Sequence, residues 1–255
     1  MVIPSTNILG IRINLIDLKT ALPLIESFIR SGKPHQIVVI NVAKIVKAQF
    51  NKYLKNIINN ADLVGADGVP VIWVSKLFKP EIPGRLNGTD LMETLVEISA
   101  QKGYSIFFFG AEEHVIQKVV SVYNAKYLGL KIAGYRNGYF SSEEEKNIVK
   151  QIRNSNADIL FIGFGTPKKE LFIKKYKYEL KVPVLHGVGG SFDIVAGKKK
   201  RAPIWMQNYG LEWFFRILQE PRRMLKRYLV TNILFIFFVI LKILGLKKFD
   251  LVDNN

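Results

Sequence analysis

Apolar strands and amphipathic helices alternate along most of the chain, and this order constrains the fold more than any other feature of the sequence. Short apolar runs, each typical of a buried strand, begin near residues 36, 61, 104, 157 and 182, and segments with helical spacing separate them. When a helix connects two consecutive strands, the second strand can pair parallel to the first. The sequence therefore predicts an α/β fold, with a mainly parallel sheet and helices on both faces.

Local signals predict the ends of several helices. Asp17 precedes a segment with helical spacing that stops at Gly32, and residues 42–60 have helical spacing throughout. Thr89 or Asp90 is placed to cap a further helix.

Four of the predicted strands end in polar or glycine-rich residues. Asn41 follows the first and Asp67 the second, while Gly163 and Gly187 lie at the ends of two later strands. In parallel sheets, ligands bind outside the carboxyl ends of the strands. We therefore expect these four strand ends to lie on one rim and to border one crevice.

Asp67 stands between a strand and the expected start of a helix, in the motif ADGVP. A carboxylate in that place is a candidate general base when a substrate hydroxyl comes within hydrogen-bond distance. Aspartate is also a preferred helix cap. Taken alone, the motif favours the cap over the base.

Two glycine-rich turns are candidates for contacts with a phosphate-bearing substrate. In GFGTPKKE (163–170), free backbone N–H groups at a helix start suit phosphate, although an ordinary strand–helix turn has the same pattern. In GVGGSFD (187–193), the backbone allows close approach and the aspartate can accept hydrogen bonds from a ribose or a base. This second turn is neither a dinucleotide fingerprint nor a Walker loop. The candidate substrate-binding residues of the two turns are Gly163, Gly165, Thr166, Lys169, Glu170, Gly189, Gly190, Ser191 and Asp193.

Positive charge is concentrated near the C-terminus. The formal net charge is +16, and residues 198–248 contain twelve lysines and arginines but only two acids, Glu212 and Glu220. Such a region suggests nucleic acid, anionic lipid or a diphosphate as the binding partner. We divide the chain into an α/β catalytic domain, 1–195, and a basic helical appendage, 196–255. The candidate phosphate-binding residues of the appendage are Arg201, Arg216, Arg222 and Arg223.

The appendage contains an apolar segment, 228–246, of nineteen residues with a single charge, Lys242. Its length is close to the ~20 apolar residues that span a bilayer. We favour a helix that lies in or dips into the membrane, and a spanning helix and a soluble core or oligomer helix stay open. The flanking basic residues suit an anionic membrane surface and favour a cytoplasmic location.

The sequence offers few ligands for a metal ion. It contains no cysteine, its three histidines are scattered, and its folded part has no DxD motif. Of the histidines, His186 alone ends a strand near the expected rim. We therefore predict no metal and no cofactor, with arginine and lysine neutralising substrate charge. The N-terminus lacks the pattern of a signal peptide.

Five motifs carry a resemblance to a known family: ADGVP, RLNGTDL, GFGTPKKE, GVGGSFDIVAGKKKRAP and GLEWFFRILQEPRR. In order and spacing they resemble the WecG/TagA/CpsF family of bacterial glycosyltransferases, over residues 7–227. The resemblance implies an inverting, metal-independent hexosyltransferase that moves a sugar from a UDP-sugar to an undecaprenyl-diphosphate-linked acceptor, on the cytoplasmic face of the bacterial cell membrane. Its best known members transfer N-acetylmannosamine, or its uronic acid, to N-acetylglucosamine in teichoic acid or other cell-surface polysaccharide synthesis.

The resemblance also implies roles for single residues. Asp67 matches the proposed catalytic base, and Arg85 matches an arginine that acts on the diphosphate. Asn41 matches an active-site asparagine, and Asp193 an acid near the nucleotide. The family's appendage completes the active site and helps to bind the membrane, and its arginines are matched by Arg216, Arg222 and Arg223.

Two positions depart from the family pattern. Val39 stands where the family often has threonine, and Lys169 where it usually has glutamine. The identity of the donor sugar therefore stays open, with UDP-glucose and UDP-galactose, for capsule or exopolysaccharide, as the alternatives. From another class, a non-catalytic nucleic-acid-binding protein fits the charge, but outside the C-terminal region basic residues interleaved with exposed aromatic residues on a binding face are not evident. We expect no nucleic acid partner, and self-association stays open.

Overall fold

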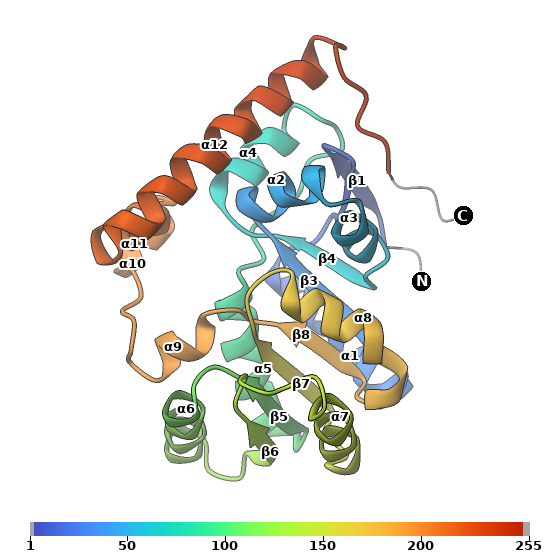
Figure 1. Ribbon diagram of the computed structural model, residues 1–255, viewed down its shortest axis with the longest axis vertical. Helices are drawn as coiled ribbons and strands as arrows, with labels where there is room; N and C mark the ends of the chain where they lie inside the picture. Colours follow the sequence, from blue (N-terminus) through green and yellow to red (C-terminus); the bar gives the residue numbers. More distant parts are fainter. Residues whose placement is uncertain (1–2, 252–255) are drawn as a thin grey trace.

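A six-stranded parallel sheet forms the centre of the molecule (Figure 1). The structure is a computed structural model that describes residues 3–251. The strands of the sheet, in the spatial order β4-β3-β8-β7-β5-β6, are β3 (His35–Ile40), β4 (Leu63–Ala66), β5 (Ser105–Gly110), β6 (Lys131–Arg136), β7 (Ile159–Gly163) and β8 (Val184–Gly187). All their pairings are parallel. A separate antiparallel hairpin joins β1 (Ser5–Ile8) to β2 (Ile11–Asn14).

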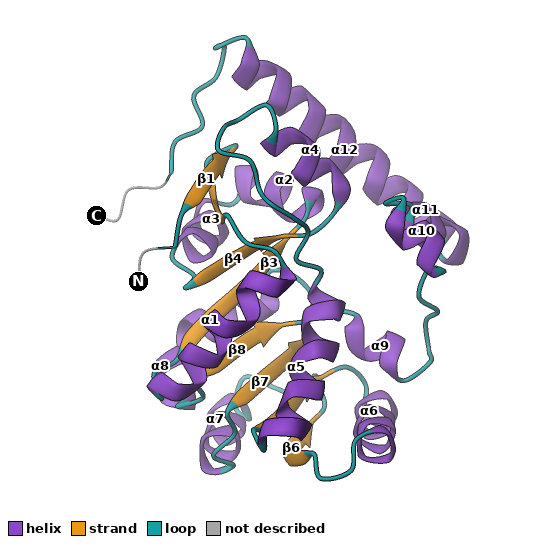
Figure 2. Ribbon diagram, turned by 180° about the vertical axis from the view of Figure 1, so that it is seen from behind, coloured by secondary structure: helices purple, strands orange, loops and turns teal. Residues whose placement is uncertain are grey.

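Helices cover both faces of this sheet, as Figures 1 and 2 show from opposite sides. One face packs against α1 (Leu18–Ser31), α5 (Gly88–Lys102) and α6 (Glu113–Lys126), which share one apolar cluster. The other face packs against α7 (Glu145–Asn154) and α8 (Lys168–Leu180). A third cluster joins the hairpin to α2 (Val42–Phe50), α3 (Lys52–Asn59) and α4 (Val69–Ser75). The predicted α/β fold, with helices on both faces of a mainly parallel sheet, is confirmed.

The C-terminal part of the chain is helical. After α9 (Ser191–Val195) come α10 (Ile204–Asn208), α11 (Glu212–Gln219) and α12 (Pro221–Ile243). We call residues 196–251, the described part of the predicted appendage, the appendage. Its longest helix, α12, runs along the outside of the molecule against α2 (Figure 1).

One side of α12 belongs to the core of the protein. Phe235, Phe238 and Val239 are buried in the cluster that contains the hairpin and α2. The opposite side is exposed and apolar, and includes Phe237 and Ile240. Among the described residues, α12 is the helix that is long and apolar enough to cross a membrane. A helix with one side packed in the core of the protein is not surrounded by lipid, so this packing disfavours a spanning helix.

One of the predicted helix ends agrees with the structure and two differ. Asp17 caps α1 as predicted, accepting a hydrogen bond from the Thr20 N–H at 2.8 Å. The predicted helix 42–60, however, is split at Asn51, which has an extended backbone and whose side chain accepts from the Leu54 N–H at 2.9 Å. Asparagine offers this alternative hydrogen bond and so ends one helix and caps the next.

The cap of α5 is Asn87, rather than Thr89 or Asp90. Its side-chain oxygen accepts from the backbone N–H groups of Thr89 and Asp90, at 2.9 and 3.2 Å. The side chain of Asp90 is therefore available for an ion pair with Arg201 of the appendage.

The packing of α12 predicts a large difference between two of its phenylalanines. Phe235 is 2% exposed and Phe237 is 51% exposed. Replacing Phe235 by alanine should lower the free energy of unfolding by about 3 kcal/mol, because it leaves a cavity in the core. Phe237→Ala, the matched control, should change it by less than about 1 kcal/mol. Urea unfolding without detergent measures both, and equal losses would contradict the docking of α12 on the core.

Candidate active site

The four strand ends singled out by the sequence belong to four neighbouring strands, β4-β3-β8-β7, and lie on one rim of the sheet. Ile40 pairs with Ala66 at the ends of β3 and β4. The pairing continues one residue further, since the Asp67 N–H donates to the carbonyl of Ile40 at 2.6 Å. Asn41 and Asp67 therefore stand beside each other where the two strands end.

Asp67 does not cap the helix that follows it. The N-cap position of α4 is held by Gly68, whose φ of 92° suits glycine and turns the chain into the helix. The Asp67 carboxylate instead accepts a hydrogen bond from the side-chain amide of Asn87, at 3.1 Å. The geometry therefore excludes the interpretation of Asp67 as a helix cap, and its carboxylate is available as a candidate general base.

A short segment before α5 lies against the end of β4 and brings more side chains to Asp67. The Leu86 N–H donates to the carbonyl of Ala66 at 2.7 Å. The Leu86 side chain packs over Gly65, where any Cβ would collide with a leucine methyl carbon. Glycine at this position lets the segment approach, and Arg85 and Asn87 on either side of Leu86 reach the same space as Asp67.

That space is a cavity of about 360 Å³ between the rim of the sheet and the appendage. The α/β part contributes the ends of β3 and β4, the start of α4 and the segment before α5. The appendage contributes α11, the turn before it and the first half of α12. The lining residues are Asn41, Val42, Ala43, Asp67, Gly68, Val69, Pro70, Trp73, Arg85, Asn87, Tyr209, Gly210, Leu211, Glu212, Trp213, Arg216, Arg227, Tyr228, Thr231 and Asn232.

Burial raises the pKa of the Asp67 carboxyl above its ordinary value. The charges of Arg216 and Arg85 act in the opposite direction, as does the hydrogen bond from Asn87, while the charge of Glu212 adds to the increase. A carboxylate with a raised pKa is a better proton acceptor, which is what a general base requires. The cavity thus combines a candidate base with arginines that can hold an anionic group.

The residues predicted around GFGTPKKE form a buried polar cluster beside this cavity. Lys44 of α2 lies 2.9 Å from the Glu170 carboxylate, and Lys169 donates to the Thr166 hydroxyl at 2.8 Å. Burial lowers the pKa of Lys169 to about 8. Burial alone would raise the pKa of Glu170, but Lys44 and Lys169 lower it to about 2. Lys169 is turned inward over Gly187, so it does not line the cavity.

The glycines of the two turns differ in their surroundings. Gly165, Gly189 and Gly190 have no atom within 4 Å of the place where a Cβ would stand, so a ligand can approach their backbone. Gly189 also has a φ of 60°, which favours glycine. Gly163, in contrast, is packed against Phe192.

The polar residues of the second turn are held by neighbouring segments. Ser191 is buried and hydrogen-bonds to the Thr89 hydroxyl at 2.9 Å. Asp193 forms an ion pair with Lys199 at 3.0 Å. Both residues lie outside the cavity lining, further along the same rim of the sheet.

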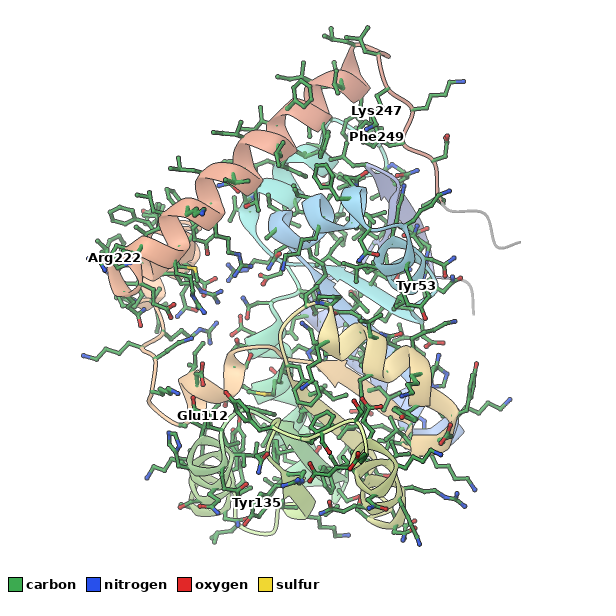
Figure 3. The ribbon with its side chains drawn as sticks, viewed as in Figure 1. Tyr53, Glu112, Tyr135, Arg222, Lys247 and Phe249 are labelled. Atoms are coloured by element: carbon green, nitrogen blue, oxygen red, sulfur yellow. The ribbon has the colours of Figure 1, made fainter. Side chains whose placement is uncertain are left out.

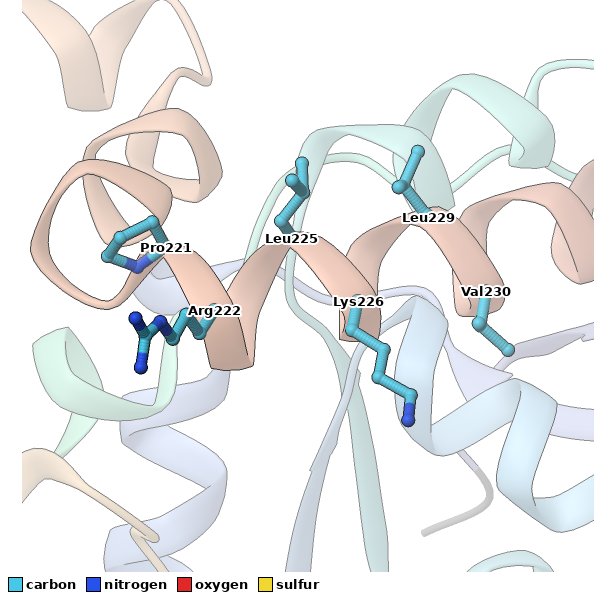
Figure 4. A pocket seen from close by; sticks show the side chains of 6 residues that line it. All are labelled: Pro221, Arg222, Leu225, Lys226, Leu229 and Val230. Atoms are coloured by element: carbon cyan, nitrogen blue, oxygen red, sulfur yellow. The ribbon is translucent and has the colours of Figure 1, made fainter.

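The four predicted arginines of the appendage have different positions. Arg216 lines the cavity, and Arg201 forms an ion pair with Asp90 at its edge. Arg223 is exposed and contacts Glu220 at 2.6 Å. Arg222 points outward at the start of α12 (Figure 3). There it borders a shallow depression whose lining comes entirely from that helix: Pro221, Arg222, Leu225, Lys226, Leu229 and Val230 (Figure 4).

Sequence reasoning missed several residues that line the cavity, chiefly Asn87, Glu212, Arg227 and Tyr228. Asn87 lies in the motif RLNGTDL and is a residue type that caps helices, which is a usable signal. Glu212 is an acid in a strongly basic region, which is also informative. Arg227 and Tyr228 carry no local signal, because only the docking of α12 brings them to the cavity.

Within residues 3–251, no group of three or more histidine, aspartate or glutamate side chains has the arrangement of a metal site. Metal independence stays a prediction.

Comparisons with known proteins give one family and concordant relatives. Residues 6–249 match the family described as "Glycosyl transferase WecG/TagA/CpsF family". A protein of Bacillus spizizenii is 35% identical over 197 residues, which cover 77% of this chain and 76% of that protein. A protein of Bacillus subtilis is 36% identical over 168 residues, 66% of this chain and 65% of that protein. Both are named N-acetylglucosaminyldiphosphoundecaprenol N-acetyl-beta-D-mannosaminyltransferase.

His186, near the rim, predicts a dependence of stability on pH. It is fully buried between β3 and β7, neither ring nitrogen has a hydrogen-bond partner among the described residues, and burial lowers its pKa to about 4. Between about pH 6.5 and 4 the unfolded chain binds a proton here and the folded chain does not, so stability falls as the pH falls.

Acidification from pH 7 to 4 should therefore remove about 3 kcal/mol of unfolding free energy through this group. His186→Leu should lack this part of the pH dependence, while replacing the exposed His114 by leucine should keep it. Urea titrations at a series of pH values measure the slope, and identical slopes in wild type and His186→Leu would contradict a neutral buried histidine.

Proposed function

The chain belongs to the WecG/TagA/CpsF family of glycosyl transferases, and we propose that it transfers N-acetylmannosamine from its UDP derivative to undecaprenyl-diphosphate-linked N-acetylglucosamine. Donor and acceptor follow from the names of relatives that share about a third of their residues with most of this chain. The observation that carries the proposal is Asp67, a carboxylate with a raised pKa in a cavity that three arginines also line.

In the proposed reaction, Asp67 accepts the proton of the acceptor hydroxyl. The hydroxyl oxygen forms a new bond to the anomeric carbon of the donor, and the bond from that carbon to the UDP oxygen breaks. UDP leaves with the electron pair, and direct displacement inverts the anomeric centre. Arg85 and Arg216 line the same cavity and stabilise the negative charge on the leaving diphosphate. Asn41 and Asn87 orient the sugar and the base.

The nucleotide is expected on the same rim, beside the cavity. Gly165, Gly189 and Gly190 leave their backbone accessible there, and Asp193 lies on the helix that follows the second turn. This arrangement supports the assignment of the two turns to UDP, as the resemblance implies. No metal ion is needed in this scheme, since the arginines neutralise the diphosphate.

Of the two alternatives, the one within the family stays open and the one from another class is disfavoured. UDP-glucose or UDP-galactose as donor remains the rival within the family, because Val39 and Lys169 depart from its pattern. The positive charge that suggested nucleic acid lies at the cavity and on the appendage. We therefore assign that charge to phosphates of the substrates and to lipid headgroups.

We also propose that the protein binds the cytoplasmic face of the cell membrane through the outer side of α12. Apolar side chains cover this side, and Arg222 and Lys226 stand among them near the start of the helix (Figure 4). Apolar residues beside lysines and arginines are typical of helices that bind anionic membranes. This position would place the cavity beside the lipid-linked acceptor.

A panel of UDP-sugars tests the function. With a lipid-diphosphate-linked N-acetylglucosamine acceptor, turnover should be highest with UDP-N-acetylmannosamine and on the order of a hundredfold lower with UDP-glucose. Asp67→Asn should lower turnover by ~10²–10⁴-fold, because the base is lost, and leave UDP affinity nearly unchanged. Initial rates and calorimetry with UDP measure the two effects.

A preference for another UDP-sugar would show that the proposed donor is wrong, while the proposed class of reaction, glycosyl transfer from a UDP-sugar, would stand. Near-normal turnover of Asp67→Asn would show that the base is another group. Absence of turnover together with absence of UDP binding would reject the enzyme and leave a membrane scaffold.

Flotation with vesicles tests the membrane assignment. Replacing Phe237 and Ile240 together by glutamate should lower the bound fraction on phosphatidylglycerol vesicles on the order of tenfold or more, because apolar area is lost and negative charge is added. Tyr178→Glu, at an exposed position on α8, is the matched control and should bind as wild type.

High salt should weaken binding of the wild type, and alkaline carbonate should release it from the vesicles. Wild-type protein that resists alkaline carbonate would indicate a spanning helix instead. Unchanged binding of the double variant would move the membrane contact to another surface.

A further inference from the structure

An acid of the appendage, Glu212, stands among the arginines of the cavity. Its Oε2 lies 2.7 Å from Nη1 of Arg85, and its Oε1 lies 3.9 Å from Nε of Arg201. All three side chains are at least 70% buried. Pairs in such a position are screened by water less than pairs on the surface.

These contacts join three segments that are distant in the sequence. Arg85 lies between β4 and α5, Arg201 lies between α9 and α10, and Glu212 lies in the first turn of α11. Arg201 is also paired with Asp90 of α5. A single carboxylate of α11 thus connects the appendage to the segment that supports Asp67.

We propose that Glu212 is a positioning residue for the transfer reaction: it fixes Arg85 and Arg201 at the cavity and supplies the negative charge that keeps Asp67 an effective proton acceptor among arginines. The inference rests on the proposed role of Asp67 as the base.

The charges in the cavity show why a second acid is needed. Arg85, Arg216 and Arg227 line it, against the carboxylates of Asp67 and Glu212. Tyr209 and Tyr228 are the other titratable residues of the lining, and Asn87 donates directly to Asp67.

Nearby positive charge favours an ionised carboxylate and lowers its pKa, which makes it a weaker base. Arginines that stabilise the leaving diphosphate therefore work against the base. Glu212 opposes this effect in two ways. Its own negative charge raises the pKa of Asp67. Its ion pair with Arg85 also offsets the positive charge of that arginine, and it is this positive charge that lowers the pKa of Asp67.

The position of Glu212 also links the base to the appendage. The carboxylate reaches Arg85 only when α11 is docked, and α12 begins two residues after α11 ends. The negative charge of Glu212 therefore acts on Asp67 only when α11 and α12 are docked over the cavity. Asp67 is then the most effective proton acceptor in the state in which the appendage is docked.

Glu212→Gln in the full-length protein tests the inference, because it removes the charge and keeps the size. The titration of the Asp67 carboxyl, followed by ¹³C NMR and assigned with Asp67→Asn, should move to lower pH. The acidic limb of the kcat/KM profile should move in the same direction. The plateau of kcat should fall at least about threefold, since a weaker base transfers the proton less readily.

Two variants act as controls. Glu212→Asp keeps the charge, so the Asp67 titration should return toward that of the wild type. Glu220→Gln removes an acid of the same appendage that contacts Lys199 and Arg223 and does not line the cavity, so the titration should stay in place.

An unchanged Asp67 titration in Glu212→Gln would overturn the inference, and so would a change that Glu220→Gln reproduces. Lower thermal stability with an unchanged titration would show that Glu212 only holds the fold. The NMR titration requires no turnover, so it tests Glu212 even when the donor panel is negative, and a negative panel rejects only the proposed function.

Discussion

One backbone hydrogen bond fixes the geometry of the site. The N–H of Asp67 donates to the carbonyl of Ile40, which extends the pairing of β3 and β4 by one residue beyond β4. The carboxylate that follows one strand and the amide of Asn41 that follows the other are thereby held together. Asn41 also caps α2, accepting from the Lys44 N–H at 3.1 Å, and α2 is the helix on which α12 packs. The proposed base and α12, the helix that we propose to bind the membrane, are thus connected through a single short helix.

The site must satisfy two electrostatic requirements that oppose each other. A leaving diphosphate calls for arginines, whereas a general base calls for a carboxylate that has not been made too acidic by them. Both kinds of group line one cavity, and they come from different parts of the chain. The pKa of Asp67 is set by its burial and by nearby groups. Burial and the charge of Glu212 raise this pKa, whereas the arginines and the hydrogen bond from the amide of Asn87 lower it. Lys44, Lys169 and Glu170, a step further along the rim, form a separate cluster in which both lysines contact the carboxylate of Glu170.

The sequence was sufficient to predict the parallel sheet and the shared rim of the four polar or glycine-rich strand ends, because alternating strands and helices force parallel pairing and bring strand ends together. It did not predict the break at Asn51, since helical spacing describes which side of a helix is apolar and continues across a change of backbone direction. Nor could the motif decide whether Asp67 is a cap or a base, because aspartate suits both; the conformation of Gly68 excludes the cap. Glu212 contacts Arg85 across 127 positions of the chain, and no local pattern encodes a contact of that range.

The division of α12 into a buried side and an exposed side has a consequence for how the protein is distributed in the cell. Phe235, Phe238 and Val239 hold the helix on the core, so its fold does not require insertion into lipid. In the proposed arrangement, one folded form exists both in the cytosol and on the bilayer, and the two populations exchange by mass action. The fraction beside the lipid-linked acceptor then follows the anionic lipid content of the membrane. A cell could thus alter the rate of glycan assembly by changing its lipids, with the amount of enzyme held constant.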